Sequence, residues 1–193
     1  DPGFIIKSDK DGWTHLYRYS IDGKLINRIT DGEWCVADLV LVDEAEGIIY
    51  FTARKEITTN TDLYRVNLNG KNLKRLTSGD YTHSINISPR GKYFIDTYSN
   101  VATPSIMKLY TTDGKLVREL GDSRTDEFEK YELAIPKIFH VRTSDGINLP
   151  VIWTLPIKFD ENKRYPVLID VYGGPDTYDV SNSWKRLRSQ WLA

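Results

Sequence analysis

The feature that most constrains the fold of this chain is an internal repeat of about 46 residues. Each copy contains a Leu-Tyr pair, then a turn with a glycine, then an arginine followed by an apolar residue, although the third copy is less regular. The tyrosines of the three copies are Tyr17, Tyr64 and Tyr110, which are 47 and 46 residues apart. A period of this length with several short strands per copy is typical of the blades of a β-propeller.

Each complete copy can be divided into four strands. In the middle copy we expect them at about residues 34–42, 47–54, 61–68 and 71–77. Hairpin turns between the last two strands are predicted by Asp22-Gly23, Asn69-Gly70 and Asp113-Gly114. The first copy begins at Phe4 without an opening strand, and the third runs over about 81–120. We therefore expect about two and a half blades within residues 1–121, fewer than the roughly 4–8 blades of a closed ring, and a sequence cut at its amino end.

The pattern changes after Gly121. Residues 122–136 are rich in charge and lack an apolar period, which favours a linker. Two further strands are expected at 137–142 and 147–155, and the apolar run 167–171 predicts a strand buried on both faces of a mostly parallel sheet. A helical spacing relates Trp184, Leu187 and Trp191. These features assign residues 137–193 to the opening portion of an α/β domain.

One candidate site residue, Tyr172, follows the apolar run directly. It precedes Gly173-Gly174-Pro175, where two permissive residues and a rigid one predict a sharp turn. Open α/β sheets place their ligands at the carboxyl ends of their strands, which is where Tyr172 would stand. The alternative is a core tyrosine whose hydroxyl is satisfied within the protein.

The blade repeats, Trp153-Thr154-Leu155-Pro156 and the segment 163–175 together resemble the prolyl oligopeptidase family of serine peptidases, and within it the bacterial dipeptidyl peptidase IV branch. The resemblance implies a mostly β fold, with a partial propeller followed by the opening strands of an α/β-hydrolase domain. It implies a parent enzyme that acts on peptide substrates with a penultimate Pro or Ala and releases dipeptides through a Ser-Asp-His triad. It also gives Tyr172 a role, as the hydroxyl that donates to the oxyanion of the intermediate.

The chain has no Gly-x-Ser-x-Gly segment, so we expect the nucleophile, Asp and His of the triad to lie outside it and the chain alone to be inactive. The family suggests a homodimeric parent and a periplasmic or cell-envelope location, although no residue shows either. Open blade edges could also drive self-association of the chain. Two alternatives stay open: a non-catalytic propeller module that binds peptides or proteins, and a related oligopeptidase or acylaminoacyl-peptidase.

Composition excludes several other functions. The chain has 26 basic and 27 acidic residues, a balance that gives no electrostatic footprint for nucleic acid. No apolar run approaches a membrane span, and the lone Cys35 rules out an internal disulfide.

No cofactor or metal site is expected. Residues 9–12 resemble the start of a calcium loop, but the later ligands are missing, so a polar turn is the better interpretation. Three histidines lack any arrangement typical of a catalytic base and are assigned structural or surface roles: His15, His83 and His140. Trp13 and Trp34 are expected in the cores of the blades.

Overall fold

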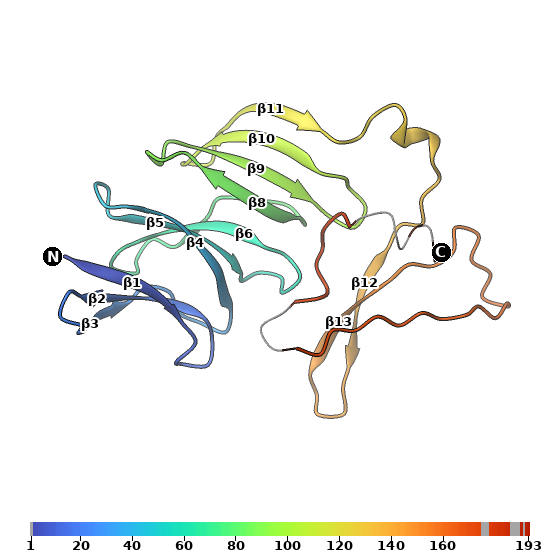
Figure 1. The fold of residues 1–193 in the computed structure, drawn as a ribbon, viewed down its shortest axis with the longest axis horizontal. Helices are drawn as coiled ribbons and strands as arrows, with labels where there is room; N and C mark the ends of the chain where they lie inside the picture. The colour runs from blue at the N-terminus through green and yellow to red at the C-terminus, as the bar shows by residue number, and fades with distance from the viewer. Residues whose placement is uncertain (1, 175–177, 186–189, 191) are drawn as a thin grey trace.

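The computed structural model describes residues 2–174, 178–185, 190, 192 and 193. Its antiparallel sheets follow one another along the chain (Figure 1). The first sheet contains β1 (Gly3–Ser8), β2 (His15–Ser20) and β3 (Leu25–Arg28). The second contains β4 (Cys35–Asp43), β5 (Ile48–Arg54), β6 (Asp62–Asn67) and β7 (Lys74–Arg75). The third contains β8 (Thr82–Ile87), β9 (Tyr93–Ser99), β10 (Ile106–Thr111) and β11 (Leu116–Asp122).

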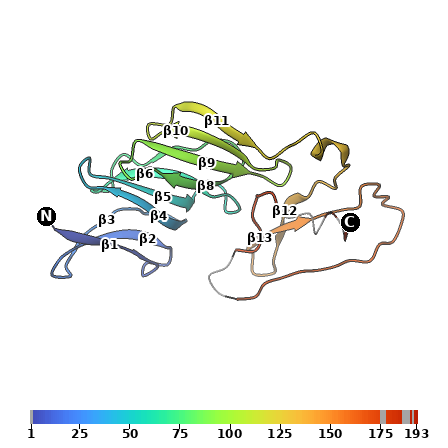
Figure 2. The ribbon, with the colours of Figure 1, turned by 45° about the horizontal axis from the view of Figure 1, so that its top comes forward.

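The three sheets are stacked as successive blades (Figure 2), which confirms the predicted partial propeller. Strands pair in chain order within each blade, and the first blade has three strands, as expected from its start near Phe4. The repeat tyrosines lie on β2, β6 and β10, the corresponding strands of the three blades. The predicted hairpin glycines Gly23 and Gly70 have φ of 82° and 81°, a left-handed conformation that a side chain would strain.

The main apolar core lies between the first and second blades. Its ring stack places Trp34 at 6.2 Å from Phe51 and 6.4 Å from Tyr64, measured between centroids. A smaller cluster joins the second and third blades through Leu63, Tyr50 and Phe94. Trp34 is thus a core residue as expected, but the expectation for Trp13 was wrong: it is 42% exposed, because it lies in the β1–β2 connection rather than on a strand.

Polar contacts join the first blade to the second and, at equivalent positions, the second blade to the third. We call these two sets of contacts the first and the second seam. The carbonyl of Thr14 accepts a hydrogen bond from the amide of Val36 at 2.8 Å, and the carbonyl of Thr61 accepts one from the amide of His83 at 2.9 Å. The residue that follows each threonine is buried and polar, His15 in the first blade and Asp62 in the second. The repeat therefore sets both the apolar core and the position of the polar groups between blades.

In the second seam, most of the polar contacts involve Asp62. Its Oδ1 lies 2.7 Å from Arg75 Nη2 and accepts a hydrogen bond of 2.8 Å from the hydroxyl of Thr77. His83 Nε2 is 3.6 Å from the same oxygen, while His83 Nδ1 is 2.9 Å from Asp96. Because these groups come from both blades, the cluster joins the second blade to the third.

In the first seam, His15 is hydrogen-bonded as a neutral ring. Nε2 lies 2.8 Å from the carbonyl oxygen of Gly32, which can only accept, and Nδ1 lies 3.0 Å from the hydroxyl of Thr30. Desolvation by burial lowers the pKa of His15 below its ordinary value of 6.5. The unfolded chain consequently binds a proton at His15 at a higher pH than the folded chain does.

We expect the melting temperature to fall as the pH is lowered from about 6.5 through the folded pKa of His15, because protons then favour the unfolded state. The variant His15→Gln should show a smaller drop over the same range when both are followed by scanning calorimetry between neutral and acidic pH. His140→Gln, at an exposed histidine on a later strand, is the control and should keep the wild-type slope. If the melting temperature fell equally with pH in wild type and His15→Gln, the lowered pKa of folded His15 would not be the cause.

After the blades, the chain forms the short 3₁₀ helix η1 (Phe128–Lys130) and a hairpin of β12 (Lys137–Arg142) and β13 (Asn148–Trp153).

The predicted buried strand at 167–171 is not found. Val167, Ile169 and Val171 are 77–81% exposed, and none of the described strands pairs with this segment. A strand needs a neighbour for its backbone hydrogen bonds, and the described residues supply none. The predicted helical spacing of Trp184, Leu187 and Trp191 falls largely outside the described residues.

Candidate functional site

The predicted site residue Tyr172 lies in the extended segment after the hairpin and is 60% exposed. Its ring lies against the backbone of Gly174: a Cβ added there would stand 2.5 Å from the Tyr172 hydroxyl oxygen. A side chain at position 174 would therefore make the Tyr172 ring shift, and the exposed ring has room to do so.

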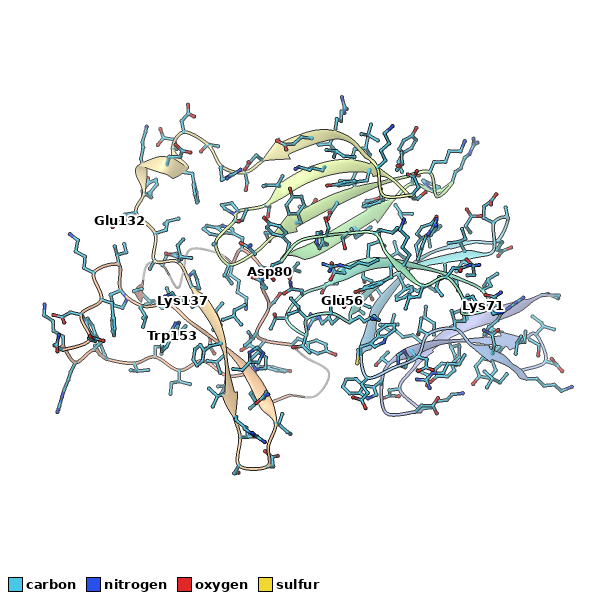
Figure 3. The ribbon with its side chains drawn as sticks, turned by 180° about the vertical axis from the view of Figure 1, so that it is seen from behind. Glu56, Lys71, Asp80, Glu132, Lys137 and Trp153 are labelled. Carbon is cyan, nitrogen blue, oxygen red and sulfur yellow. The ribbon has the colours of Figure 1, made fainter. Side chains whose placement is uncertain are left out.

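The chain returns to the blades at residues 178–185 and is fixed there by Asn182, which is 5% exposed. The Asn182 amide N–H donates to the carbonyl of Thr59 at 2.9 Å, and its side-chain Nδ2 donates to Asp80 Oδ1 at 2.8 Å. Its side-chain oxygen accepts from the amide of Val101 at 3.2 Å. The three partners lie in the connections β5–β6, β7–β8 and β9–β10, at one end of the second and third blades (Figure 3, Asp80 labelled).

Three neighbouring contacts extend this junction. The backbone amide of Trp184 donates to the hydroxyl of Ser99 at 3.1 Å, and the Trp184 ring meets Phe128 of η1 at 5.6 Å in an edge-on arrangement. The amide side chain of Gln190 donates to the carbonyl of Ala134 at 2.6 Å. The segment that follows Tyr172 is thus anchored both to the blades and to the connection before β12.

A further contact joins Arg54, the last residue of β5, to Tyr178. The guanidinium carbon lies 3.8 Å from the centre of the Tyr178 ring. Two nitrogens of Arg54, Nε and Nη1, are buried and have no hydrogen-bond partner among the residues that the structure describes, and burial lowers the pKa of the guanidinium. A cavity of about 340 Å³ lies here, lined by Lys7, Thr14, Cys35, Val36, Ala37, Arg54 and Tyr178.

A larger groove of about 870 Å³ lies at the opposite end of the blades, among the turns β4–β5, β8–β9 and β10–β11. Its charged lining mixes both signs, with Asp43 and Glu46 facing Arg90 and Lys92. Since neither Tyr172 nor the anchored segment reaches that end, we place the candidate site at the end that carries Asn182. Among the described residues, no group of three or more His, Cys, Asp or Glu side chains could hold a metal ion.

Asn182 and Arg54 could not have been identified from sequence patterns. The Asn182 side chain bonds to residues 81 and 102 positions away, and no local motif marks it. The predicted structural roles of His15 and His83 agree with their burial within the seams. Within the described part of the chain, no helix is long and apolar enough to cross a membrane.

We expect Asn182→Ala to release the anchored segment, because it leaves the amide of Val101 without its acceptor and removes one of the two side-chain donors to Asp80 Oδ1, at a cost of about 1–3 kcal/mol. Hydrogen exchange of residues 178–185 should then accelerate by about tenfold or more, since each 1.4 kcal/mol is roughly a factor of ten. Ser183→Ala, at the next position, serves as the control and should leave the exchange rate nearly unchanged. Unaltered exchange in Asn182→Ala would show that other contacts hold the segment.

Comparison with known proteins places these features in a family context. Residues 1–105 match the family model of the dipeptidyl peptidase IV N-terminal region. The dipeptidyl peptidase 4 of Trichophyton tonsurans is 32% identical over 190 residues, which cover 95% of this chain and 24% of that protein. The dipeptidyl peptidase 4 of Arthroderma otae is 33% identical with the same coverage. The chain therefore spans about a quarter of the length of these relatives.

Two solved bacterial structures are also similar. Dipeptidyl peptidase 4 of Porphyromonas gingivalis superposes with a TM-score of 0.90 at 29% identity, over 98% of this chain and 27% of that one. A putative dipeptidyl aminopeptidase IV from Bacteroides ovatus gives a TM-score of 0.81 at 26% identity, over 98% of this chain and 30% of that one. Both superpositions extend past the blades into the segment that carries Tyr172 and Asn182.

Proposed function

Because the chain belongs to the dipeptidyl peptidase IV family, we propose that it is the part of a serine exopeptidase in which the last propeller blades meet the opening of the catalytic domain. The parent enzyme would release Xaa-Pro or Xaa-Ala dipeptides from peptide amino termini by acyl transfer. In this proposal residues 1–121 are blades, 122–136 a linker and 137–193 the start of an α/β-hydrolase domain. A triad carried elsewhere in the protein would supply the nucleophile.

The observation that carries the proposal is the anchoring of the segment after Tyr172 onto the blades by Asn182. A non-catalytic propeller has no need for an extension that carries Tyr172 and then returns to the loops of the blades. In a peptidase, the same anchor would hold a donor hydroxyl at the junction between the peptide-binding blades and the catalytic domain. Preorganised donors of this kind stabilise the oxyanion more than the substrate carbonyl.

The test compares chromogenic substrates in the full-length protein that contains this chain. We expect hydrolysis of Gly-Pro-p-nitroanilide, no hydrolysis of its N-acetylated form, and inactivation by an organophosphate that reacts with activated serine. Release of p-nitroaniline from the acetylated form alone would favour the related-oligopeptidase alternative, because the enzyme would then cut after Pro behind a blocked amino terminus. No hydrolysis of either, with peptide binding retained, would favour the binding module.

The 193-residue chain alone should hydrolyse neither substrate, because its sequence contains no nucleophile elbow. Turnover by the purified chain would contradict that part of the proposal. The measurement needs a preparation free of host peptidases, for which a Tyr172→Phe chain prepared in parallel is the control.

A further inference from the structure

Arg54 is a half-buried cation for which the described residues provide no anion. Its Nε and Nη1 atoms lack hydrogen-bond partners, and its electrostatic neighbours are the hydroxyl of Tyr178 and the thiol of Cys35. The adjacent lysine differs, since Lys55 Nζ lies 3.2 Å from the carboxylate of Glu56. Burying a guanidinium without a partner is unfavourable, so an unpaired one in a folded protein calls for a ligand or a function.

The surroundings of Arg54 favour a carboxylate. A second cation, Lys7, lines the same cavity, although it also lies 3.7 Å from Asp38 Oδ1. The volume of about 340 Å³ falls within the range of small ligand pockets. Guanidinium groups bind carboxylates through charge-assisted hydrogen bonds, which are stronger than neutral ones.

Tyr178 covers the guanidinium but is not packed into a core. Its ring lies over Arg54 at 3.8 Å, while the residue itself remains 56% exposed. A rotation of this ring would uncover the donors of Arg54 to the cavity. Tyr178 is six positions after Tyr172, so their Cα atoms are at most about 20 Å apart, a distance that an extended peptide of six residues spans.

We propose that Arg54, covered by Tyr178, is a subsite that binds a carboxylate of the peptide substrate or product. This inference rests on the proposed function, because that function brings peptides to this end of the blades. The carboxylate belongs either to the C-terminus of the peptide or to an acidic side chain. Binding at this site makes the enzyme prefer acidic or short peptides, in addition to its preference for Pro or Ala before the cleaved bond.

Cys35 offers a direct readout of the site. It is the Cα partner of Arg54 in the β4–β5 ladder, it lines the same cavity, and it is the single cysteine of the chain. A ligand bound to Arg54 should therefore slow alkylation of Cys35 by neutral iodoacetamide. Mass spectrometry of the peptide that contains Cys35 gives this rate in the full-length protein as well.

The probes are three N-acetylated glycine peptides: one with a free C-terminal carboxylate, one amidated, and one amidated with a single internal Glu. Their blocked amino termini keep them from being substrates of a dipeptidyl peptidase. We expect saturable protection by the first, the third or both, about tenfold at ten times Kd by mass action, and none by the neutral amide. The protecting peptide identifies the source of the carboxylate. Equal protection by all three, or protection by none, would overturn the inference.

Two variants test whether Arg54 itself binds the carboxylate. Arg54→Met should abolish the protection while keeping or raising the melting temperature, because it removes a half-buried charge that has no anion among the described residues. The matched control Lys55→Met removes the neighbouring cation and should keep the protection. A marked loss of thermal stability in Arg54→Met with protection intact would assign Arg54 a structural role. Because none of these measurements requires turnover, they stand apart from the p-nitroanilide assay, and either proposal can fail without the other.

Discussion

Replacing Tyr172 by Phe should lower kcat of the parent enzyme by about 10²–10³-fold, the usual effect of removing one oxyanion donor. The ring would keep its place over Gly174, because only the hydroxyl is removed. Since that hydroxyl acts on the intermediate and hardly on the substrate, kcat and kcat/KM should fall together with little change in KM. Steady-state kinetics on Gly-Pro-p-nitroanilide measure all three quantities.

Tyr131→Phe is the matched control, because Tyr131 is 67% exposed and lies outside the segment 167–174. It should leave kcat unchanged, and both variants should melt at the wild-type temperature. If Tyr172→Phe raised KM and kept kcat, the hydroxyl would contribute to substrate binding and not to the oxyanion. Wild-type values for both parameters would remove Tyr172 from the site.

Replacing Asp62 by Ala should destabilise the folded chain by about 2–4 kcal/mol. The change removes the acceptor of the Thr77 hydroxyl and the partner of Arg75 at 2.7 Å within a seam where Asp62 itself is 1% exposed. We expect less than the largest penalties known for broken buried pairs, because the Arg75 side chain is 29% exposed and its stranded charge is partly screened. The midpoint of a guanidinium chloride titration gives the change.

Asp62→Asn separates the two contributions, since it keeps an oxygen that accepts from Thr77 and loses the charge opposite Arg75. Its midpoint should lie between those of wild type and Asp62→Ala. Glu161→Ala, at an exposed acid far from the seam, should change stability by no more than about 0.5 kcal/mol. An Asp62→Ala midpoint equal to that of Glu161→Ala would mean that the seam contributes little to the joining of the blades.

The blades were predictable because their signals are local and repeat. Period-two strands separated by Asn-Gly and Asp-Gly turns fix each hairpin within about twenty residues of chain, so strand positions such as 47–54 and 61–68 agree with the observed β5 and β6. The expected core position was right for Trp34 and wrong for Trp13, because Trp13 lies in the β1–β2 connection, which the structure leaves exposed.

The apolar run 167–171 shows the limit of local reasoning. Its composition predicts burial, but burial requires partner strands and covering side chains, and in the described structure the run is exposed. The sequence could name Tyr172 through a turn motif. It could not give the surroundings of the Tyr172 hydroxyl, so the role of this hydroxyl at the oxyanion stays a prediction.

The sequence by itself determined the repeat, the blade strands, their hairpins and the position of one candidate hydroxyl, because each depends on residues close together in the chain. Only the tertiary structure decided where the segment after Tyr172 is anchored and which cation has no anion among the described residues. Asn182 meets partners 81 and 102 positions away, and Arg54 meets Tyr178 across most of the chain. Such contacts depend on how the blades and the returning segment pack together, and packing between distant segments leaves no periodic pattern in a single sequence.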